Sequence, residues 1–513
     1  MTGAEALIRT LLAGAVDTCF TNPGTSEIHV VAALDRIGEM RCVPGLFEGV
    51  VTAAADGYAR MAEKPACTLL HLGPGFANGI ANLHNARRAH VPMVNIIGQH
   101  AIPHHRHDTP LDGDIESIAR PYSRWLRTSR CASTAGRDAA EAVTASRAAG
   151  GQIATLIVPA DVSWSEGASI APLFPPPEAE MPGREMVERA AAMLRSGLRT
   201  AILLSGNALY GKGLEAAGHV AAATGAKLFA PYPFTRLQCG AGLPAVERVH
   251  YILEQAKQQL GEFRQLILVG AQAPVAYFAY PGKDSTLTPA ECEILTLANA
   301  DQNCAGVMEA LTALLPGTRQ LVEETPGRPA LPDGDITLTG LASAIGALLP
   351  ENAIVVDESM TSGRGIMAAA RTAPPHDWLG NTGGSIGIAM PLAVGAAVAS
   401  PDRRVLCLSA DGSGMYTLQA LWTMAREGLK ITTVIFANRA YAVLKREFSY
   451  LGAGDPGQLA SSLFDIGCPD LDWVQLARGL GVPAVRATSL GEFTQALRGG
   501  FESGGPTLIE VPL

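Results

Sequence analysis

The chain carries at residues 405–444 the stretch VLCLSADGSGMYTLQALWTMAREGLKITTVIFANRAYAVL. A short apolar run leads to Asp411, a helical pattern follows, and a second apolar run leads to Asn438. Apolar runs without polar alternation are typical of strands covered on both faces, and a helix between two of them indicates a parallel α/β unit. Because the carboxyl ends of parallel strands meet at one edge of a sheet, we expect Asp411 and Asn438 to lie close together.

These residue types suit a divalent metal ion and a phosphate group. Asp411 and Asn438 each offer a hard oxygen, and a nearby backbone carbonyl would add a third; Mg²⁺ takes few protein oxygens and completes its shell with phosphate oxygens and water. Gly412 lets the backbone approach a phosphate, and Ser413 can donate to it at a helix N-terminus. Alone, Asp-Gly-Ser is also typical of a turn followed by a helix cap. The Asn 27 positions after Asp411, at the end of a second buried strand, favours the metal and phosphate site.

The rest of the chain repeats this alternation of apolar runs and helical patterns. Two Pro-rich stretches, residues 171–185 and 323–335, read as linkers, and a length of 513 residues suggests about three domains. We therefore predict an α/β fold of three doubly wound parallel-sheet domains, at residues 1–170, 184–324 and 336–513. The expected strands lie within residues 16–24, 66–75, 93–99, 153–161, 200–206, 227–233, 265–271, 353–359, 404–414, 432–440 and 507–513.

Composition and charge exclude several classes of function. The net charge is −9, the pI is about 5.7 and no basic stripe is present, which disfavours nucleic-acid binding. No segment approaches the roughly 18–20 apolar residues of a membrane span. The start of the chain, MTGAEALIRTLLAG, predicts the first helix of the fold rather than a signal peptide. Nine cysteines without a CxxC pair indicate small buried side chains in a reducing cytoplasm.

Residues 405–444 resemble the thiamine-diphosphate (ThDP) motif, which begins with Gly-Asp-Gly and ends in Asn-Asn. Two positions depart from it: Ala410 replaces the leading glycine and Ala437 the first Asn of the closing pair. Neither change removes a metal ligand. The resemblance implies that Mg²⁺ is bound by Asp411, Asn438 and the backbone carbonyl of Ala440. It also implies that Gly412 and Ser413 contact the diphosphate.

Further motifs extend the resemblance over the whole chain. NTGGSIGIAMPLAVGAA, residues 381–397, is similar to the glycine-rich stretch of this family, where the Gly384 carbonyl would accept from the cofactor's 4′-amino group and Ile386 would bend the cofactor into a V. DESMTSG, residues 357–363, resembles a second diphosphate contact, through Thr361 and Ser362. NPGTSE, residues 22–27, and HLGPGFANG, residues 71–79, resemble the pyrimidine-binding domain. The three predicted blocks then correspond to pyrimidine-binding, middle and diphosphate-binding domains.

Glu48 stands inside an apolar run, LFEGVVTAAADGYARM at residues 46–61. A buried carboxylate costs several kcal/mol unless a partner compensates it. In the family an acid at this position hydrogen-bonds the cofactor's N1′ atom and helps to form a C2 ylide, which attacks a 2-oxo acid and yields CO2 and an enamine. The two halves of the site come from different subunits, so the resemblance implies a homodimer, commonly paired into a homotetramer.

The motifs are most similar to the benzoylformate decarboxylase group. Its substrate-binding Ser corresponds to Thr25, which keeps a hydroxyl, and one of its histidines to His71, which can relay a proton. Its second histidine corresponds to Ala279, so that acid/base group is missing. His104 and His105 match the His pair of pyruvate decarboxylases, whose C-terminal Glu is here Leu444. The cluster of His104, His105 and His107 is also compatible with a polar surface loop. A zinc site is a further alternative, although no remote set of ligands is evident for it.

Acetolactate synthases share Gly98-Gln99 and Arg120-Pro121, but Pro110-Leu111-Asp112 replaces their Phe-Gln-Glu run. We therefore predict a ThDP- and Mg²⁺-dependent non-oxidative decarboxylase of a small-molecule 2-oxo acid, with an acetolactate synthase-like carboligase as the alternative. A cofactor-binding paralogue without catalysis is a third reading. A CoA substrate is disfavoured because the last strand ends the chain. The substrate side chain, and nucleotide binding by the middle domain, stay open.

Overall fold

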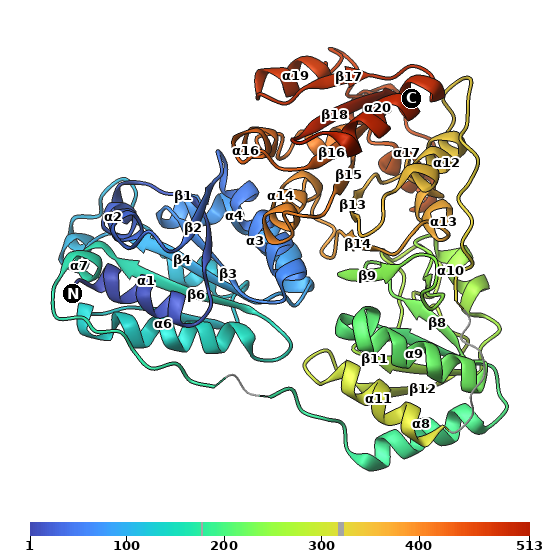
Figure 1. Ribbon diagram of the computed structural model, residues 1–513, viewed down its shortest axis with the longest axis horizontal. Helices are drawn as coiled ribbons and strands as arrows, with labels where there is room; N and C mark the ends of the chain where they lie inside the picture. Colours follow the sequence, from blue (N-terminus) through green and yellow to red (C-terminus); the bar gives the residue numbers. More distant parts are fainter. Residues whose placement is uncertain (176–177, 316–322) are drawn as a thin grey trace.

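The computed structural model describes residues 1–175, 178–315 and 323–513, and its three lobes each contain a parallel sheet flanked by helices (Figure 1). The N-terminal domain is blue to cyan, the middle domain green to yellow, and the C-terminal domain orange to red. This confirms the α/β fold class. The block boundaries stay a prediction, and parts of the linker at 171–185 and of the end of the middle block lie outside the described residues.

The N-terminal domain contains a six-stranded parallel sheet in the order β2-β1-β3-β4-β6-β5. Its strands are β1 Thr18–Asn22, β2 Arg41–Pro44, β3 Ala66–Leu70, β4 Met93–Gln99, β5 Trp125–Thr128 and β6 Ile153–Pro159. Its helices are α1 Gly3–Ala13, α2 Ile28–Ile37, α3 Glu48–Ala62, α4 Leu72–Arg88, α5 Ile115–Ala119, α6 Ala132–Arg147 and α7 Ala160–Trp164, with 3₁₀ turns η1 Thr25–Glu27 and η2 Ile102–His107. The four predicted strands of this block are confirmed, as is the first helix, which a Thr2–Glu5 capping box starts.

The middle domain contains a five-stranded sheet in the order β10-β8-β7-β11-β12. Its strands are β7 Thr200–Leu204, β8 Lys227–Ala230, β10 Glu247–Arg248, β11 Gln265–Val269 and β12 Glu293–Ala298. Its helices are α8 Arg184–Arg195, η3 Gly206–Leu209, α9 Gly211–Thr224, α10 Leu253–Leu260 and α11 Cys304–Leu314. The chain order reverses between β7 and β11, so the carboxyl ends of these two strands form a topological switch point.

The C-terminal domain contains a seven-stranded sheet in the order β17-β18-β16-β15-β13-β14-β9. Its strands are β13 Ile354–Glu358, β14 His376–Gly380, β15 Val405–Ala410, β16 Ile431–Ala437, β17 Ala484–Arg486 and β18 Thr507–Pro512. Its helices are α12 Leu338–Leu348, α13 Ile366–Ala370, α14 Ala389–Ala399, α15 Asp411–Gly414, α16 Ala420–Arg426, α17 Ala442–Tyr450, α18 Gln458–Phe464, α19 Trp473–Gly479 and α20 Leu490–Glu502. Strand β9, Arg236–Cys239, comes from the middle block and pairs antiparallel with β14. The prediction of purely parallel sheets did not include this antiparallel strand.

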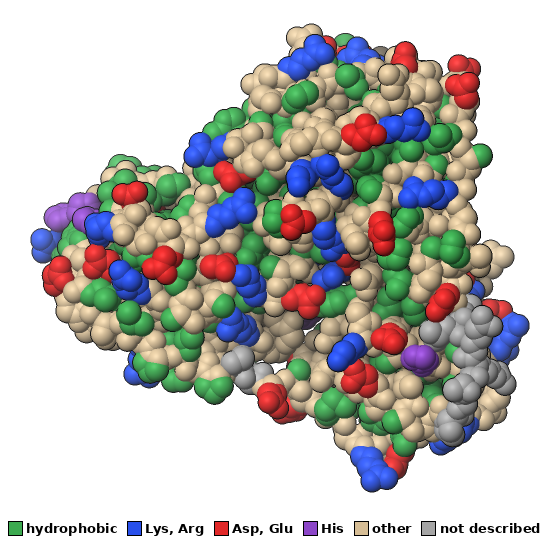
Figure 2. Space-filling view, in the orientation of Figure 1, with side chains coloured by type: hydrophobic (Ala, Val, Ile, Leu, Met, Phe, Trp, Pro, Cys, Tyr) green, Lys and Arg blue, Asp and Glu red, His purple; other side chains and the backbone are tan. Residues whose placement is uncertain are grey.

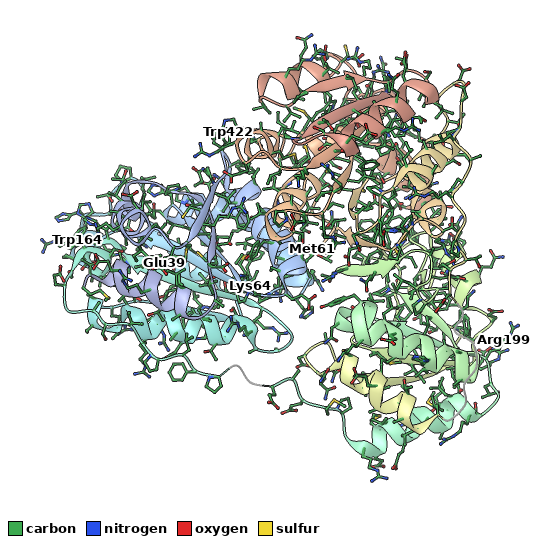
Figure 3. The ribbon with its side chains drawn as sticks, viewed as in Figure 1. Glu39, Met61, Lys64, Trp164, Arg199 and Trp422 are labelled. Atoms are coloured by element: carbon green, nitrogen blue, oxygen red, sulfur yellow. The ribbon has the colours of Figure 1, made fainter. Side chains whose placement is uncertain are left out.

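Small residues let the N- and C-terminal domains share one core. Helix α3 packs against α14 so closely that a Cβ added at Gly57 would overlap the carbonyl of Leu392, and one at Gly395 the carbonyl of Ala54. Met61 of α3, labelled in Figure 3, belongs to the same buried cluster as the α14 residues. The alanine- and glycine-rich composition of α3 and α14 therefore serves the contact between domains.

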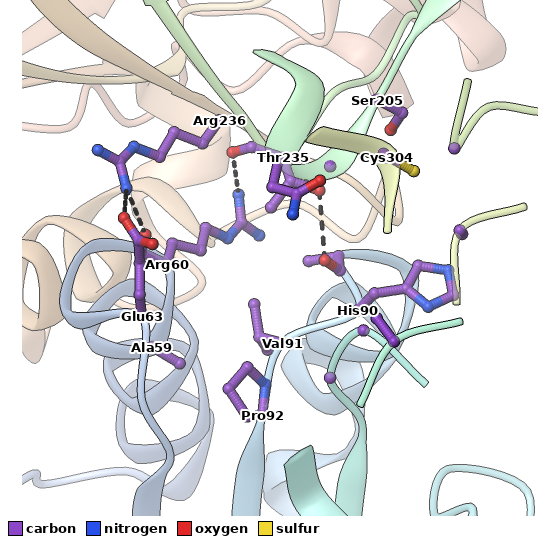
Figure 4. Close-up of a pocket in the computed structure, with 18 of the residues that line it drawn as sticks. Ala59, Arg60, Glu63, His90, Val91, Pro92, Ser205, Thr235, Arg236 and Cys304 are labelled. Carbon is purple, nitrogen blue, oxygen red and sulfur yellow. Dashed lines mark hydrogen bonds and ion pairs between the residues drawn. The ribbon is translucent and has the colours of Figure 1, made fainter. Parts of the chain in front are cut away.

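A buried ion pair on α3 ties all three domains together. Arg60 and Asp56 both have fully buried side chains, and the guanidinium donates to the two carboxylate oxygens over 2.7 and 2.8 Å. Arg60 also donates to the carbonyl of Thr235 in the middle domain over 3.0 Å (Figure 4). It donates as well to the carbonyl of Gly380 in the C-terminal domain over 2.7 Å. Because Gly380 precedes the glycine-rich stretch at 381–387, this contact also anchors the segment that carries Gly384.

The surface agrees with the composition. On the face in Figure 2, basic and acidic side chains are interspersed, with no large patch of one sign. Among the described helices, none combines the length and apolar character that crossing a bilayer requires.

Candidate active site

Asp411 and Asn438 come together at one sheet edge, as their spacing predicted. Asp411 begins α15 directly after β15, Asn438 follows β16, and these two strands are parallel neighbours. The Asp411 carboxylate accepts from the N–H of Arg439 over 2.7 Å, which links the two strand ends directly. Asp411 is 2% exposed, and burial raises the pKa of its carboxyl, while the N–H groups of Arg439 and Gly412 oppose that rise. A bound cation would further favour the ionised form.

The donors around Asp411 fit an oxygen-liganded metal ion. The Asn438 side chain donates to Ser362 Oγ over 3.4 Å, which brings the 357–363 segment to the same place. No hydrogen bond from a described residue reaches the Ala440 carbonyl, so this oxygen keeps its lone pairs for another partner. A Cβ at Gly412 would lie 2.7 Å from the Tyr441 ring, so a side chain does not fit there. In the described chain no group of three His, Cys, Asp or Glu side chains could hold a metal, and carboxylate, amide and carbonyl oxygens form the best-supported site.

Two of these loops contain backbone strain that the sequence does not reveal. Arg439, between Asn438 and Ala440, has φ +55, and Met360, beside Thr361, has φ +52. Non-glycine residues in the left-handed region cost roughly 1–3 kcal/mol and cluster at functional sites. The strain therefore coincides with the expected metal and diphosphate contacts.

The backbone of the glycine-rich segment 381–387 is held in place by hydrogen bonds, and the Gly384 carbonyl has no donor among the described residues. Asn381 accepts from the N–H of Gly384 over 2.9 Å, and Gly384 has φ +77, which suits glycine. No described residue donates to the Gly384 carbonyl. A Cβ at Gly384 would overlap the hydroxyl of Tyr277, so this position has neither the conformation nor the space for a side chain. Ile386 follows two positions later and is half-buried.

Glu358 supports this segment, and sequence reasoning missed it. Its carboxylate accepts from the N–H groups of Gly387, over 3.0 Å, and Ala389, over 3.1 Å, and from the Asn381 side chain over 3.1 Å. Burial raises the pKa of Glu358 to about 7, and these hydrogen bonds oppose the rise. An acidic pair directly after the apolar run 353–356 was the available signal, but the partners of Glu358 lie 23 to 31 positions further along the chain.

Glu48 is the first residue of α3 and is 8% exposed. Its one side-chain hydrogen bond to a described residue comes from Asn78 of α4, over 3.0 Å, and no described cation pairs with it. Its second carboxylate oxygen lies against Gly75, where an added Cβ would be 3.1 Å away. A buried, under-partnered carboxylate fits the role of holding or sharing a proton with a bound ring nitrogen.

His71 lies beside Glu48 and is paired with a buried acid. The backbone around Gly75 adjoins both side chains. His71 Nδ1 lies 2.7 Å from a carboxylate oxygen of Glu27, a fully buried residue whose other oxygen has no hydrogen-bond partner. Burial raises the pKa of Glu27, while hydrogen bonds from Gly24 and His71 lower it. Thr25 lies in the same 3₁₀ turn as Glu27, and its side chain is exposed. The NPGTSE motif contained Glu27, but only the fold shows that it orients His71.

The histidines at 104 and 105 lie in the exposed turn η2 after β4. His105 Nδ1 is 2.9 Å from Asp112, and His104 is exposed. Between this turn and His71 lies His100: burial lowers its pKa, Asp112 raises it, and the charges of His104, His105 and His71 lower it further. The structure thus places the four histidines in one electrostatic neighbourhood, at the carboxyl edge of β3 and β4.

Comparison with known proteins decides the family. The model described as "Thiamine pyrophosphate enzyme, N-terminal TPP binding domain" matches residues 1–117, and the corresponding C-terminal TPP binding domain matches residues 362–511. The protein named "Putative acetolactate synthase large subunit IlvX" of Mycobacterium tuberculosis is 52% identical over 516 residues, covering 100% of this chain and 99% of that protein. The chain belongs to the thiamine pyrophosphate enzyme family. It is therefore a ThDP-dependent enzyme, and Mg²⁺ is the usual partner metal in this family.

More distant members of the ThDP enzyme family also align along the whole chain. Benzoylformate decarboxylase of Pseudomonas aeruginosa is 28% identical over 525 residues, covering 96% of each protein. The solved structure of Rhodococcus jostii RHA1 thiamine diphosphate-dependent 4-hydroxybenzoylformate decarboxylase superposes with a TM-score of 0.88 at 22% identity, covering 100% of this chain and 99% of that one. This last similarity shows the shared fold.

Two cavities lie at the junctions between the domains. One, of about 400 Å³, lies where the three domains meet and reaches Ser205 and Cys304 at the switch point of the middle sheet (Figure 4). The other, of about 360 Å³, lies between the middle and C-terminal domains and is lined in part by Thr361 and Gly384. Only the second touches residues expected to hold the cofactor.

Proposed function

We propose that this ThDP enzyme is a Mg²⁺-dependent, non-oxidative decarboxylase of a 2-oxo acid. The observation that carries the proposal is the pair of His71 and Glu27, 2.7 Å apart and adjacent to the buried acid Glu48. After CO2 leaves a 2-oxo acid, the carbon that carried it must gain a proton before an aldehyde is released. A histidine oriented by a buried acid suits that transfer.

The cofactor-binding residues have separate roles. Asp411, Asn438 and the Ala440 carbonyl would hold Mg²⁺. Four further groups would contact the diphosphate: the side chains of Thr361, Ser362 and Ser413 and the backbone of Gly412. Gly384 and Ile386 would fix the cofactor's bend, and Glu48 would hold a proton towards its pyrimidine ring. When bound, ThDP supplies the nucleophilic carbon and the electron sink for decarboxylation, while the chain supplies orientation and electrostatics.

A carboligase is the second candidate. The relative at 52% identity carries an acetolactate synthase name, which favours the joining of two 2-oxo acid units. Against it, residues 110–112 lack the Phe-Gln-Glu run of those enzymes, and Asp112 instead accepts from His105. A panel of 2-oxo acids incubated with protein, ThDP and Mg²⁺ separates the two: CO2 with aldehyde supports the decarboxylase, and CO2 with an acyloin supports the carboligase.

The role of His71 gives this test its internal control. His71→Ala should slow aldehyde release while leaving ThDP binding intact, whereas His219→Ala, at an exposed position of α9, should behave like wild type. Unchanged aldehyde release in His71→Ala would contradict the assignment. A protein that binds ThDP without consuming any 2-oxo acid would favour the non-catalytic reading.

We also propose that each site is shared between two subunits. Glu48 contacts α4 near Gly75, whereas segment 382–385 is held near Asn85 of the same helix, by Ser385 N–H to Asn85 over 3.2 Å and by Thr382 to the Asn85 carbonyl over 2.8 Å. The ten residues from Gly75 to Asn85 span about 15 Å of α-helix. A single aminopyrimidine ring does not bridge that distance, so Glu48 would serve the cofactor of a partner subunit.

Complementation tests this arrangement. Glu48→Gln and Asp411→Ala should each be inactive alone. If sites are shared, a mixed dimer has one intact site, so randomly mixed subunits should recover about a quarter of wild-type activity. No recovery after verified subunit exchange would show that each chain completes its own site. A tetramer of two such dimers follows the family habit, and the nine unpaired cysteines support a cytoplasmic location.

A further inference from the structure

The cavity beside Gly384 is unusually basic. It lies between the middle domain, which contributes β10 and α10, and the C-terminal domain, which contributes α17 and the segment before α13 (Figure 1). Arg248 of β10, Arg364 before α13 and Arg446 of α17 line it, and its lining includes no Asp or Glu. We call this cavity the arginine pocket. Its floor includes Thr361 and Gly384, so it opens directly next to the expected cofactor.

Two of the three guanidinium groups lack an acidic partner. Arg248 and Arg364 form no ion pair with any described residue. Arg446 pairs with Glu447 over 2.8 Å, and that acid also accepts from Tyr280 over 2.9 Å. Asp357 and Glu358 line a smaller adjoining cavity together with Arg248 and Arg364, but in the described chain neither acid forms an ion pair with these arginines. The positive charges of Arg248 and Arg364 are therefore not held in a direct ion pair with any described acid.

Aromatic rings fix the positions of two of these three charges, those of Arg248 and Arg446. The guanidinium of Arg248 lies 5.2 Å from the ring centroid of Tyr232, and that of Arg446 lies 5.2 Å from Tyr251. The two tyrosines are 5.4 Å apart, and Tyr277, at 5.4 Å from Tyr251, connects this wall to Gly384. A guanidinium stacked on a ring still presents its N–H edge, which matches the two oxygens of a carboxylate.

The chemistry decides which carboxylate these arginines would serve. Decarboxylation breaks the bond between C1 and C2, the electron pair stays at C2, CO2 leaves, and C2 then takes a proton to give the aldehyde. An ion pair to the departing carboxylate would stabilise the substrate more than the transition state and slow the step. An ion pair to a remote group binds both equally and lets that binding energy orient the reacting carbon.

We propose that the arginine pocket holds a second carboxylate, so that the substrates are 2-oxo acids whose side chain ends in one. This rests on the proposed function of the same site. Arg248 and Arg364 would hold the distal carboxylate, with Tyr232, Tyr251 and Tyr277 against the intervening carbons. A neutral side chain would gain no ion pair from these guanidinium groups and would partly cover the half-buried Arg248 without pairing it, so a carboxylate is favoured.

The first test compares matched substrates on the ThDP- and Mg²⁺-loaded enzyme. The pairs are 2-oxoglutarate with 5-methyl-2-oxohexanoate, and 4-carboxyphenylglyoxylate with 4-isopropylphenylglyoxylate. We expect kcat/KM to favour at least one diacid by about 30-fold or more. Arg248→Gln and the more exposed Arg364→Gln should remove that preference while leaving the monoacid within a few-fold. Arg189→Gln, at an exposed middle-domain position paired with Glu293, should keep it.

The second test needs no turnover. Glutarate should bind the holoenzyme more tightly than 5-methylhexanoate by calorimetry, and Arg364→Gln should weaken glutarate by about 30-fold. Equal turnover of diacids and monoacids, with the arginine variants affecting both alike, would overturn the second-carboxylate proposal and leave the decarboxylase standing. Arginine-dependent glutarate binding without consumption of any 2-oxo acid would overturn the decarboxylase and leave the anion site standing.

Discussion

Replacing Arg60 by Met should destabilise the protein strongly, because it strands a buried acid. Asp56 is fully buried and has Arg60 as its ion-pair partner, with two hydrogen bonds of 2.7 and 2.8 Å. Breaking a buried pair by removing one member costs about 3–5 kcal/mol. For a unit of 150–250 residues each kcal/mol lowers Tm by about 2–4 °C, so we expect Tm to fall by about 6–20 °C.

Two comparisons isolate the cause in scanning calorimetry at a fixed scan rate. Lys64→Met breaks the half-exposed pair with Asp17, at 2.5 Å, and should lower Tm by at most about 4 °C. The double variant Asp56→Leu with Arg60→Met removes the stranded carboxylate and should recover much of the loss. Two results would show that the stranded carboxylate is not the cause. One is a Tm of Arg60→Met equal to that of Lys64→Met, and the other is a Tm of the double variant no higher than that of Arg60→Met.

The pH dependence of Arg60→Met gives a second readout of the same reasoning. Burial raises the pKa of Asp56, and the charge of Arg60 opposes that rise. Without Arg60 the folded protein favours the protonated acid, so stability is present at low pH and is lost as pH rises through the folded pKa. The Tm deficit relative to wild type should therefore shrink from pH 8 towards pH 5, and a deficit independent of pH would contradict this account.

Three further predictions concern the cofactor site. Glu48→Gln keeps an acceptor for Asn78, so Tm should stay within a few degrees while turnover falls about 100-fold or more, measured as kcat at saturating ThDP. Gly384→Ala should abolish ThDP binding measured by calorimetry. Gly365 also has a positive φ, +90, but has open space for a Cβ, so Gly365→Ala should lower Tm without affecting ThDP binding. An equal loss of ThDP binding in both variants would show that backbone strain alone is responsible. Burial raises the pKa of Glu358 from 4.5 to about 7, so its stability contribution is lost as pH rises from about 4.5 to about 7, and Glu358→Gln should flatten the Tm–pH profile across that range.

The sequence predicted those features that depend on local pattern. Apolar runs located eleven of the strands, and the Asp411–Asn438 spacing followed because parallel strands end at one edge. Weakly apolar edge strands were missed, among them β5 and β12, since an edge position does not demand a continuous apolar run. Strand β9 was also missed because its partner β14 lies more than 130 positions away in the chain.

The supporting residues of the site could not be predicted, because their partners are brought together only by the fold. Glu27 and Glu358 are acids at strand or turn ends, and nothing local distinguishes them from ordinary caps. Their importance comes from burial and from partners on other elements, His71 for Glu27 and Gly387 with Ala389 for Glu358. The arginine pocket likewise draws on segments from two domains, so no single stretch of sequence reveals its charge.

Helix α4 connects the two kinds of contact that a shared site requires. Near its N-terminus, Asn78 holds Glu48 over 3.0 Å; near its C-terminus, His84 contacts the Gly383 carbonyl over 3.1 Å and Asn85 that of Ser385 over 2.8 Å. In the proposed dimer, each α4 would therefore orient two groups. Glu48 would be oriented towards the cofactor of the partner subunit, and the glycine-rich segment towards the cofactor of the same subunit. The helix is a stiff connection of about 10 Å between Asn78 and Asn85, so a shift at one end would be transmitted to the other. The two sites of the dimer would then be mechanically linked through two copies of α4, without any residue that contacts both cofactors.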